Sequence, residues 1–268
     1  MKPSVMPALF VGHGSPMNAI EDNDYSRCLR RLGRELPRPQ AVLCVSAHWQ
    51  TTGTQVQVHP SPETIHDFYG FPRALNEFLY PAPGAVPQAR QALEALEKVG
   101  ARETSAWGLD HGAWAVMAHL YPEADVPVFQ VSLDRRLGMD KHLALGTLLS
   151  SLRERGIMIL GSGNIVHNLS LYHPDPDAKP YEWAVDFDVA IKRVLQSQDL
   201  SSLANPEAVA PAVARLALPT EEHYLPLLYV VGARRPADGL SFPYEKIQNA
   251  SMAMRIVLFQ DAGAMVPA

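Results

Sequence analysis

Short apolar runs that alternate with amphipathic segments constrain the fold of this chain more than any other feature. The runs lie at residues 7–11, 41–47, 54–58, 126–132 and 157–163, and most of them are apolar enough to be buried on both faces. Another run, at 252–259, fits either a strand or a helix. Burial on both faces is typical of parallel strands that are covered by helices.

Amphipathic helices are expected between these strands. Apolar residues recur at helical spacing over 85–99, 140–155 and 181–196, and glycines at 100 and 156 end the first two segments. The alternation predicts an α/β fold in which a central, mostly parallel or mixed sheet is flanked by helices on both faces. A single domain over residues 1–268 is the simplest organisation for this length.

Charge and cysteine content limit the partners and the compartment. The net charge of −5 argues against nucleic acid or an anionic membrane as a partner, because both require a basic face. No window approaches the roughly 18 apolar residues of a membrane span, and no signal peptide is recognised. Cys28 and Cys44 are interpreted as free, buried thiols, so we expect a cytoplasmic protein, either monomer or homodimer.

Three histidines follow apolar strands in the same way. His13 ends "ALFVGHG", His48 ends "AVLCVSAHW", and His167 follows "IMILGSGNIV". A single histidine in such a place is more often a packed residue whose ring is hydrogen-bonded to a carbonyl. Because the carboxyl ends of parallel strands meet at one edge of a sheet, three of them indicate a shared metal site. The glycines on either side of His13 are expected to allow a sharp turn and to leave room beside its ring.

Two further histidines have suggestive surroundings. His223 stands in "LPTEEHYLPLL", where Thr220 is a candidate N-cap that would place Glu221, Glu222 and His223 in the first turn of a helix. Such a turn is either an ordinary polar helix start or the source of a fourth ligand. His111 lies in a glycine-bounded turn before a helix and is either packed or directed at a substrate.

Other catalytic patterns are incomplete. "GHGSPM" and "GSGNIV" do not complete the dinucleotide motif GxGxxG, and no GxSxG nucleophile elbow is present. The remaining histidines lack a comparable context and are interpreted as packed or solvated; these are His59, His66, His119 and His142.

Taken together, five segments resemble the class III extradiol ring-cleaving dioxygenases of the LigB-like superfamily, and in particular its 4,5-DOPA extradiol branch. The segments occur in order along nearly the whole chain: "GHGSPMNAI", "VSAHWQT", "WGLDHGAW", "GSGNIVHNL" and "EEHYLPLLYVVGA". The resemblance implies a single α/β catalytic domain that opens the ring of a catechol, such as an L-DOPA-like substrate, with O₂ as cosubstrate.

The resemblance also implies the site residues. The metal ligands fall on His13, His48 and His223, and His167 lies at or beside the metal, either as a ligand or as the acid–base group. His111 would steady the bound oxygen or a substrate hydroxyl. Glu222 is the other candidate for the metal ligand that is assigned to His223. The resemblance implies Fe(II) for catalysis, whereas purified members of the family often contain Zn(II).

Two alternative functions are compatible with the same residues. The same histidines would suit a zinc-dependent hydrolase, and a related branch of the superfamily implies a non-enzymatic protein that binds a peptide or another partner.

Candidates for the walls of the substrate pocket come from the two proline-rich loops and from the residue after His48: Trp49, Phe68, Tyr69, Phe71 and His173.

Overall fold

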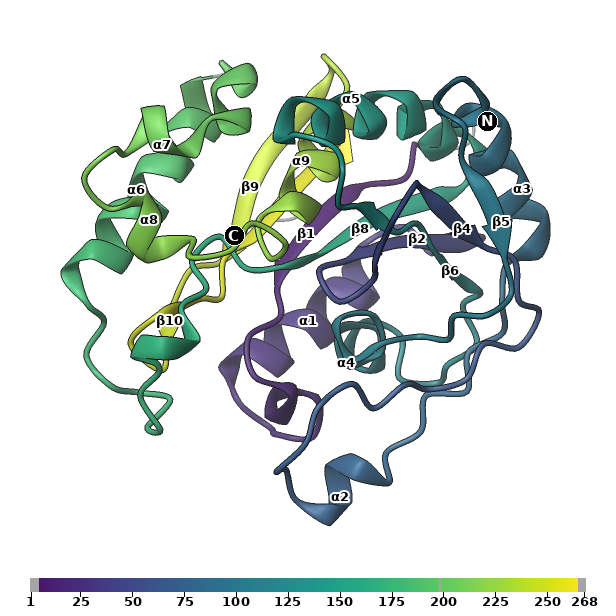
Figure 1. Cartoon of the computed structure of the whole chain (residues 1–268). Coiled ribbons are helices and arrows are strands. Elements are labelled where there is room, and N and C mark those ends of the chain that lie inside the picture. The colour runs from purple at the N-terminus through teal and green to yellow at the C-terminus, as the bar shows by residue number, and fades with distance from the viewer. Residues whose placement is uncertain (1–4, 198, 265–268) are drawn as a thin grey trace.

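Six strands form the central sheet of the computed structural model, which describes residues 5–197 and 199–264 (Figure 1). Their order is β6-β2-β8-β1-β12-β9. The bounds are β1 Ala8–Gly12, β2 Ala41–Ser46, β6 Val128–Gln130, β8 Ile157–Gly163, β9 Asp238–Tyr244 and β12 Ile256–Asp261. β6, β2, β8 and β1 are parallel, whereas β12 is antiparallel to both β1 and β9. The expected mixed sheet is therefore confirmed.

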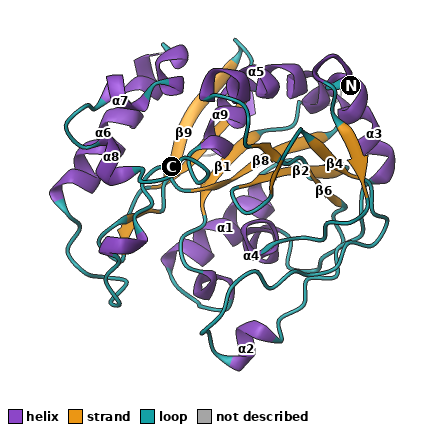
Figure 2. Ribbon diagram, in the orientation of Figure 1, coloured by secondary structure: helices purple, strands orange, loops and turns teal. Residues whose placement is uncertain are grey.

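Side chains of the central strands alternate between two hydrophobic cores. On β1, Ala8 and Phe10 belong to one core, whereas Leu9 and Val11 belong to the other, and β2 and β8 repeat this alternation. Apolar side chains of α1 and α4 fill the second core, and those of α3, α5, α6 and α9 fill the first. Figures 1 and 2 show α5 and α9 on one side of the sheet and α1 and α4 on the other.

The helices of the described residues have the following bounds: α1 Asp24–Glu35, α2 Arg73–Asn76, α3 Val86–Ala95, α4 His111–Leu120, α5 Met139–Leu149, α6 Glu182–Ser197, α7 Pro206–Val209, α8 Ala214–Ala217 and α9 Leu225–Gly232. In this part of the chain, no helix combines the length and the apolar character that a bilayer crossing requires. The helix expected over 85–99 ends as a 3₁₀ turn, Glu97–Val99, and that over 140–155 ends as Ser150–Arg155. The following Gly100 and Gly156 adopt left-handed backbone angles and stop both, as predicted.

Two of the expected strands differ in detail. The run at 54–58 forms β4, Gln55–Gln57, which lies outside the central sheet and pairs with β5, Arg102–Thr104. Its glutamines alternate with valines, so it lacks the continuous apolar character of the central strands. The run at 252–259 is strand, not helix: it splits into β11, Met252–Ala253, and β12. The remaining short strands are β3 Gln50–Thr51, β7 Leu133–Asp134 and β10 Ile247–Gln248.

The helix expected to begin at Thr220 begins later. α9 starts at Leu225, and Thr220 donates its hydroxyl hydrogen to Glu222 instead of accepting a backbone N–H. His223 therefore lies in the turn that precedes α9. The helix α1 was not anticipated, although Asn23 and Ser26 form a capping box at its start.

A buried guanidinium ties four segments together at the end of the sheet away from the histidines. Arg153 is fully buried and donates to the carbonyls of Met6, Ala233 and Phe259. It also forms two hydrogen bonds with the carboxylate of Asp238, at 2.6 and 3.1 Å. The side chain of Asp238 is itself only 3% exposed, so the two charges neutralise each other out of contact with water.

We expect Asp238→Ala to lower the free energy of unfolding by about 3–5 kcal/mol, because it leaves the Arg153 charge buried without its partner. Urea unfolding followed by circular dichroism measures this change. Asp140→Ala is the control, since it breaks an exposed ion pair with Lys141 and should cost at most about 1 kcal/mol. Equal losses for both variants would contradict the structural role of the buried pair.

Candidate metal centre and active site

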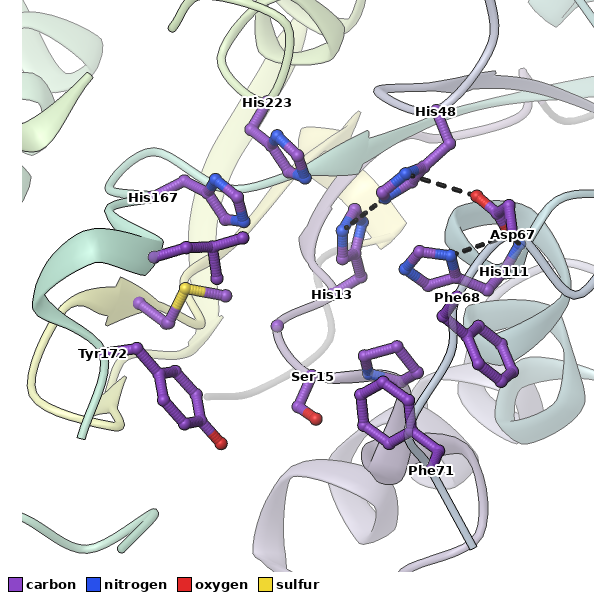
Figure 3. A pocket seen from close by; sticks show the side chains of 14 residues that line it. His13, Ser15, His48, Asp67, Phe68, Phe71, His111, His167, Tyr172 and His223 are labelled. Carbon is purple, nitrogen blue, oxygen red and sulfur yellow. Dashed lines mark hydrogen bonds and ion pairs between the residues drawn. The ribbon is translucent and has the colours of Figure 1, made fainter. Parts of the chain in front are cut away.

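Three neighbouring strands end at one edge of the sheet and deliver histidines there. His13 follows β1 directly, His48 lies two residues beyond β2, and His167 lies four residues beyond β8. Because β2, β8 and β1 are adjacent and parallel, these three residues reach the same cavity, as expected from the sequence (Figure 3).

His111 reaches this cavity from the first turn of α4, and His223 reaches it from the turn that precedes α9. The backbone carbonyl of His223 accepts a hydrogen bond from the amide of Asn164, and a side chain at Gly163 would collide with that carbonyl. His111 is the first residue of α4, and a side chain at Gly112 would press on the ring of His48. Glycine is thus required at both positions, because backbone and imidazole approach closely there.

The glycines beside His13 differ from expectation in one respect. Gly14 has a φ of +62°, which supplies the sharp turn. Gly12, however, does not leave room beside the imidazole. It packs against the backbone of Ala253 and Met254, where a Cβ atom would lie 2.4 Å from the Ala253 carbonyl oxygen.

His13, His48 and His223 form a nearly equilateral triangle. Their ring centroids are 5.1 Å, 5.3 Å and 5.1 Å apart for the pairs 13–48, 13–223 and 48–223. One nitrogen from each ring lies within 4.8 Å of the other two, and the Nε2 atoms of His13 and His48 are 3.2 Å apart. Three imidazole nitrogens at such separations suit a single divalent cation.

The tautomer of His13 follows from its hydrogen bonds. The hydroxyl of Ser162 donates its hydrogen to the carbonyl of Gly112 at 2.5 Å. It must therefore accept from Nδ1 of His13, which lies 2.9 Å away. Nδ1 carries the proton, and Nε2 presents a lone pair to the triangle.

Carboxylates hold the other two members of the triangle in the same way. Nδ1 of His48 faces Asp67 at 3.3 Å, and Nδ1 of His223 faces Glu222 at 3.0 Å. A carboxylate only accepts, so both Nδ1 atoms carry protons and both Nε2 atoms carry lone pairs. Nε2 of His223 is buried and has no hydrogen-bond partner among the described residues.

Electrostatics keep these imidazoles neutral. Burial, followed by the proximity of the other histidines, holds the pKa of His13 and His223 well below the ordinary value. Burial, together with His111, lowers the pKa of His48 to about 3. Three lone pairs that converge without a proton repel one another, and a cation removes this repulsion. The three imidazoles therefore fit a divalent metal ion, and the oxygens of Ser162, Asp67 and Glu222 orient them.

His167 lies beside the triangle in a different relation. Its ring stacks on that of His223, with centroids 3.5 Å apart and planes inclined by 8° (Figure 3). The His167 ring makes no hydrogen bond to another described residue, unlike the rings of the triangle and His111. Burial lowers the pKa of His167 to about 4, although Glu222 opposes this shift. One of its nitrogens lies within 4.8 Å of ligand atoms of Glu222 and His223, but His167 does not group with His13 and His48.

The cavity in front of the histidines has a volume of about 440 Å³ and largely apolar walls beyond them. Its lining consists of His13, Gly14, Ser15, Pro16, His48, Asp67, Phe68, Phe71, His111, His167, Leu169, Tyr172, His223 and Met252. No lysine or arginine belongs to this described lining. The aromatic side chains at its rim are placed to contact a planar ring.

Some expected wall residues lie elsewhere. Phe68 and Phe71 line the cavity as expected. Trp49 instead stacks on Trp107 in the interior, and Tyr69 is 94% exposed to solvent. His173 is not part of the lining, whereas its neighbour Tyr172 is, along with Leu169 and Met252.

Asp67 is the main functional candidate that sequence reasoning missed. It lies in the proline-rich loop that was expected to contribute to binding, but an acidic residue in a loop is usually solvated. Three of the histidines without a recognised context form hydrogen bonds inside the fold, in keeping with their interpretation as packed residues: His66 with the Phe78 carbonyl, His119 with the Asn18 carbonyl and His142 with the Tyr229 hydroxyl. Cys28 and Cys44 are free and buried, as expected.

Comparisons with known proteins find relatives over nearly the whole chain. Residues 7–254 match the family described as the catalytic LigB subunit of aromatic ring-opening dioxygenase. The chain is 44% identical over 262 residues to a 4,5-DOPA dioxygenase extradiol of Escherichia coli K12, covering 95% of this chain and 94% of that protein. It is 36% identical over 236 residues to a 4,5-DOPA dioxygenase extradiol of Beta vulgaris, with coverages of 86% and 87%. A crystal structure of an uncharacterized Escherichia coli K12 protein matches with a TM-score of 0.81 at 40% identity, covering 94% of this chain and 99% of that one.

Proposed function

Because this chain belongs to the LigB family of aromatic ring-opening dioxygenases and is an extradiol ring-cleaving enzyme for a catechol-like substrate, we propose that His13, His48 and His223 hold its metal ion. Enzymes of this family depend on a metal. The observation that carries the proposal is the convergence of three Nε2 lone pairs. Each imidazole is oriented by an oxygen that accepts from its Nδ1 atom. The proposal assigns one catalytic domain to residues 1–268, since the histidines come from both halves of the chain.

Fe(II) is the catalytic ion in this proposal, and Zn(II) is the ion expected to occupy the same ligands after purification. When bound, Fe(II) supplies a binding point for the two vicinal oxygens of the catechol and a redox partner for O₂. Three neutral imidazoles cancel none of the ion's charge, so the ligand set favours a catecholate anion over a neutral diol.

His167 acts as the acid–base group and not as a fourth ligand. A metal–imidazole bond lies in the plane of the ring, and the planes of His167 and His223 are nearly parallel with centroids 3.5 Å apart. The nitrogen lone pairs of the two stacked rings therefore lie in separate, nearly parallel planes, so the two rings would not hold one ion together. The absence of a hydrogen bond to the His167 ring from the described residues leaves it free to take a proton from a substrate hydroxyl and to return it later.

The walls orient the substrate and exclude water. Phe68, Phe71 and Tyr172 border the space beside the histidines and provide apolar and aromatic contact for the catechol ring. His111 points into the same space and contacts a substrate hydroxyl or the oxygen cosubstrate. An L-DOPA-like catechol is the proposed substrate, in keeping with the names of the relatives in Escherichia coli and Beta vulgaris.

Oxygen uptake by the Fe(II)-loaded protein with L-DOPA and with dopamine tests this function. We expect uptake that depends on both Fe(II) and catechol, together with a ring-opened product. Since no lysine or arginine belongs to the described lining, the kcat/KM values should differ by less than about tenfold, or 1.4 kcal/mol. The proposal fails if no catechol supports oxygen uptake, and a preference for L-DOPA above about a hundredfold contradicts the account of the walls.

A further inference from the structure

Asp67 contacts two of the cavity histidines at once. Its Oδ1 atom accepts from the backbone amide of His111 at 3.0 Å and from Nδ1 of His111 at 2.9 Å. Its Oδ2 atom lies 3.3 Å from Nδ1 of His48. Figure 3 shows dashed lines from Asp67 to both rings, whose centroids are 3.9 Å apart. The residue's backbone faces solvent, but its side chain is only 20% exposed.

The three contacts determine where both imidazoles present their lone pairs. The backbone amide and Nδ1 of His111 converge on one oxygen of Asp67, and Nδ1 of His48 faces the other, which is the arrangement of an accepting carboxylate. It therefore accepts from Nδ1 of both rings, and their Nε2 atoms are left as acceptors. For His48 this atom faces Nε2 of His13 at 3.2 Å, and His111 lines the cavity.

We propose that Asp67 is a positioning residue that sets the tautomer and orientation of His48 and His111 together. This inference rests on the proposed function of His48 as a metal ligand. One carboxylate then links metal affinity to the recognition of a substrate hydroxyl. His111 accepts a hydrogen bond through Nε2, because its Nδ1 proton is engaged by Asp67.

Asp67→Asn separates the two roles of the carboxylate. The amide oxygen of asparagine stays with His111, where two N–H donors converge, so its NH₂ group faces Nδ1 of His48. Two donors cannot pair, and His48 must either move or shift its proton to Nε2, where it blocks a metal. Asp67→Glu keeps the charge, but its extra methylene group prevents the carboxylate from holding both rings in their present places.

Zinc titration of the metal-free protein against a chromophoric chelator tests this inference without any measurement of turnover. We expect Asp67→Asn to bind Zn(II) about 10–100-fold more weakly than the unaltered chain, which is the usual cost of losing an outer hydrogen bond to a ligand. Asp67→Glu should lie between the two, at least about threefold weaker than the unaltered chain. Glu63→Gln is the matched control, because it removes an exposed acid from the same loop and should change affinity less than twofold.

The outcomes distinguish this inference from the proposed function. If the unaltered chain binds zinc no better than His13→Ala, the proposed metal site is wrong. If the unaltered chain binds zinc tightly and both Asp67 variants match it within twofold, the role of Asp67 is wrong. Melting of each metal-free variant identifies a folding defect, and should Asp67→Asn not fold, Asp67→Glu decides the question alone. With Fe(II) saturating, Asp67→Asn should also raise the KM for the catechol, which a purely structural acid would not do.

Discussion

His167→Ala is expected to lower the kcat of catechol cleavage by about 10²–10⁴-fold while the protein keeps its metal. The reason is geometric: the ring of His167 is parallel to that of His223 and lies outside the group formed by His13, His48 and His223. Its removal takes away a proton acceptor but none of the three converging lone pairs. Metal analysis of the purified variant and oxygen uptake with Fe(II) measure the two quantities separately.

The control for this variant is His173→Ala, in the loop that leads away from the cavity. His173 is exposed and outside the cavity lining, so its removal should leave kcat within about twofold. If His167→Ala loses metal as completely as a ligand variant does, His167 is a ligand and the acid–base assignment is wrong. If it keeps full turnover, the residue has no part in the reaction.

His223→Ala is expected to weaken metal binding by more than about 100-fold and to abolish ring cleavage. Loss of a ligand should lower metal affinity more than loss of the hydrogen bond that orients a ligand. The Nε2 atom of His223 is buried and has no hydrogen-bond partner among the described residues. Removing it leaves two nitrogens to hold the ion. Zinc titration of the metal-free protein measures the change in affinity directly.

Thermal unfolding supplies an independent reading of the same variant. An ion that binds only the folded state stabilises it, by about 2.7 kcal/mol at a free concentration 100 times Kd. The unaltered chain should therefore melt at a higher temperature with added zinc, whereas His223→Ala should not respond at that concentration. Glu222→Gln, which keeps the ligand but weakens its outer hydrogen bond, should retain a reduced response. A full zinc response in His223→Ala would contradict the proposed ligand set.

The central sheet could be predicted from the sequence because its central strands are continuous apolar runs. The runs at 8–12, 41–46 and 157–163 are buried throughout, and such runs leave few alternatives to parallel strands under helices. Local signals also identified the ends of two helices at Gly100 and Gly156. The prediction of a helix from Thr220 was wrong, since Thr220 bonds the side chain of Glu222 and α9 begins only after the turn that contains His223.

The chain's sequence by itself determined that histidines would gather at one edge of the sheet, because parallel strands end on the same side. Only the tertiary structure decided how each imidazole is oriented. His13 depends on Ser162, which is 149 residues away, and His48 and His111 depend on Asp67 in a separate loop. The stacking of His167 on His223 likewise joins two loops. A hydrogen bond or a ring stack is sensitive to fractions of an ångström in the relative placement of distant segments, and the packing of the whole fold sets that placement.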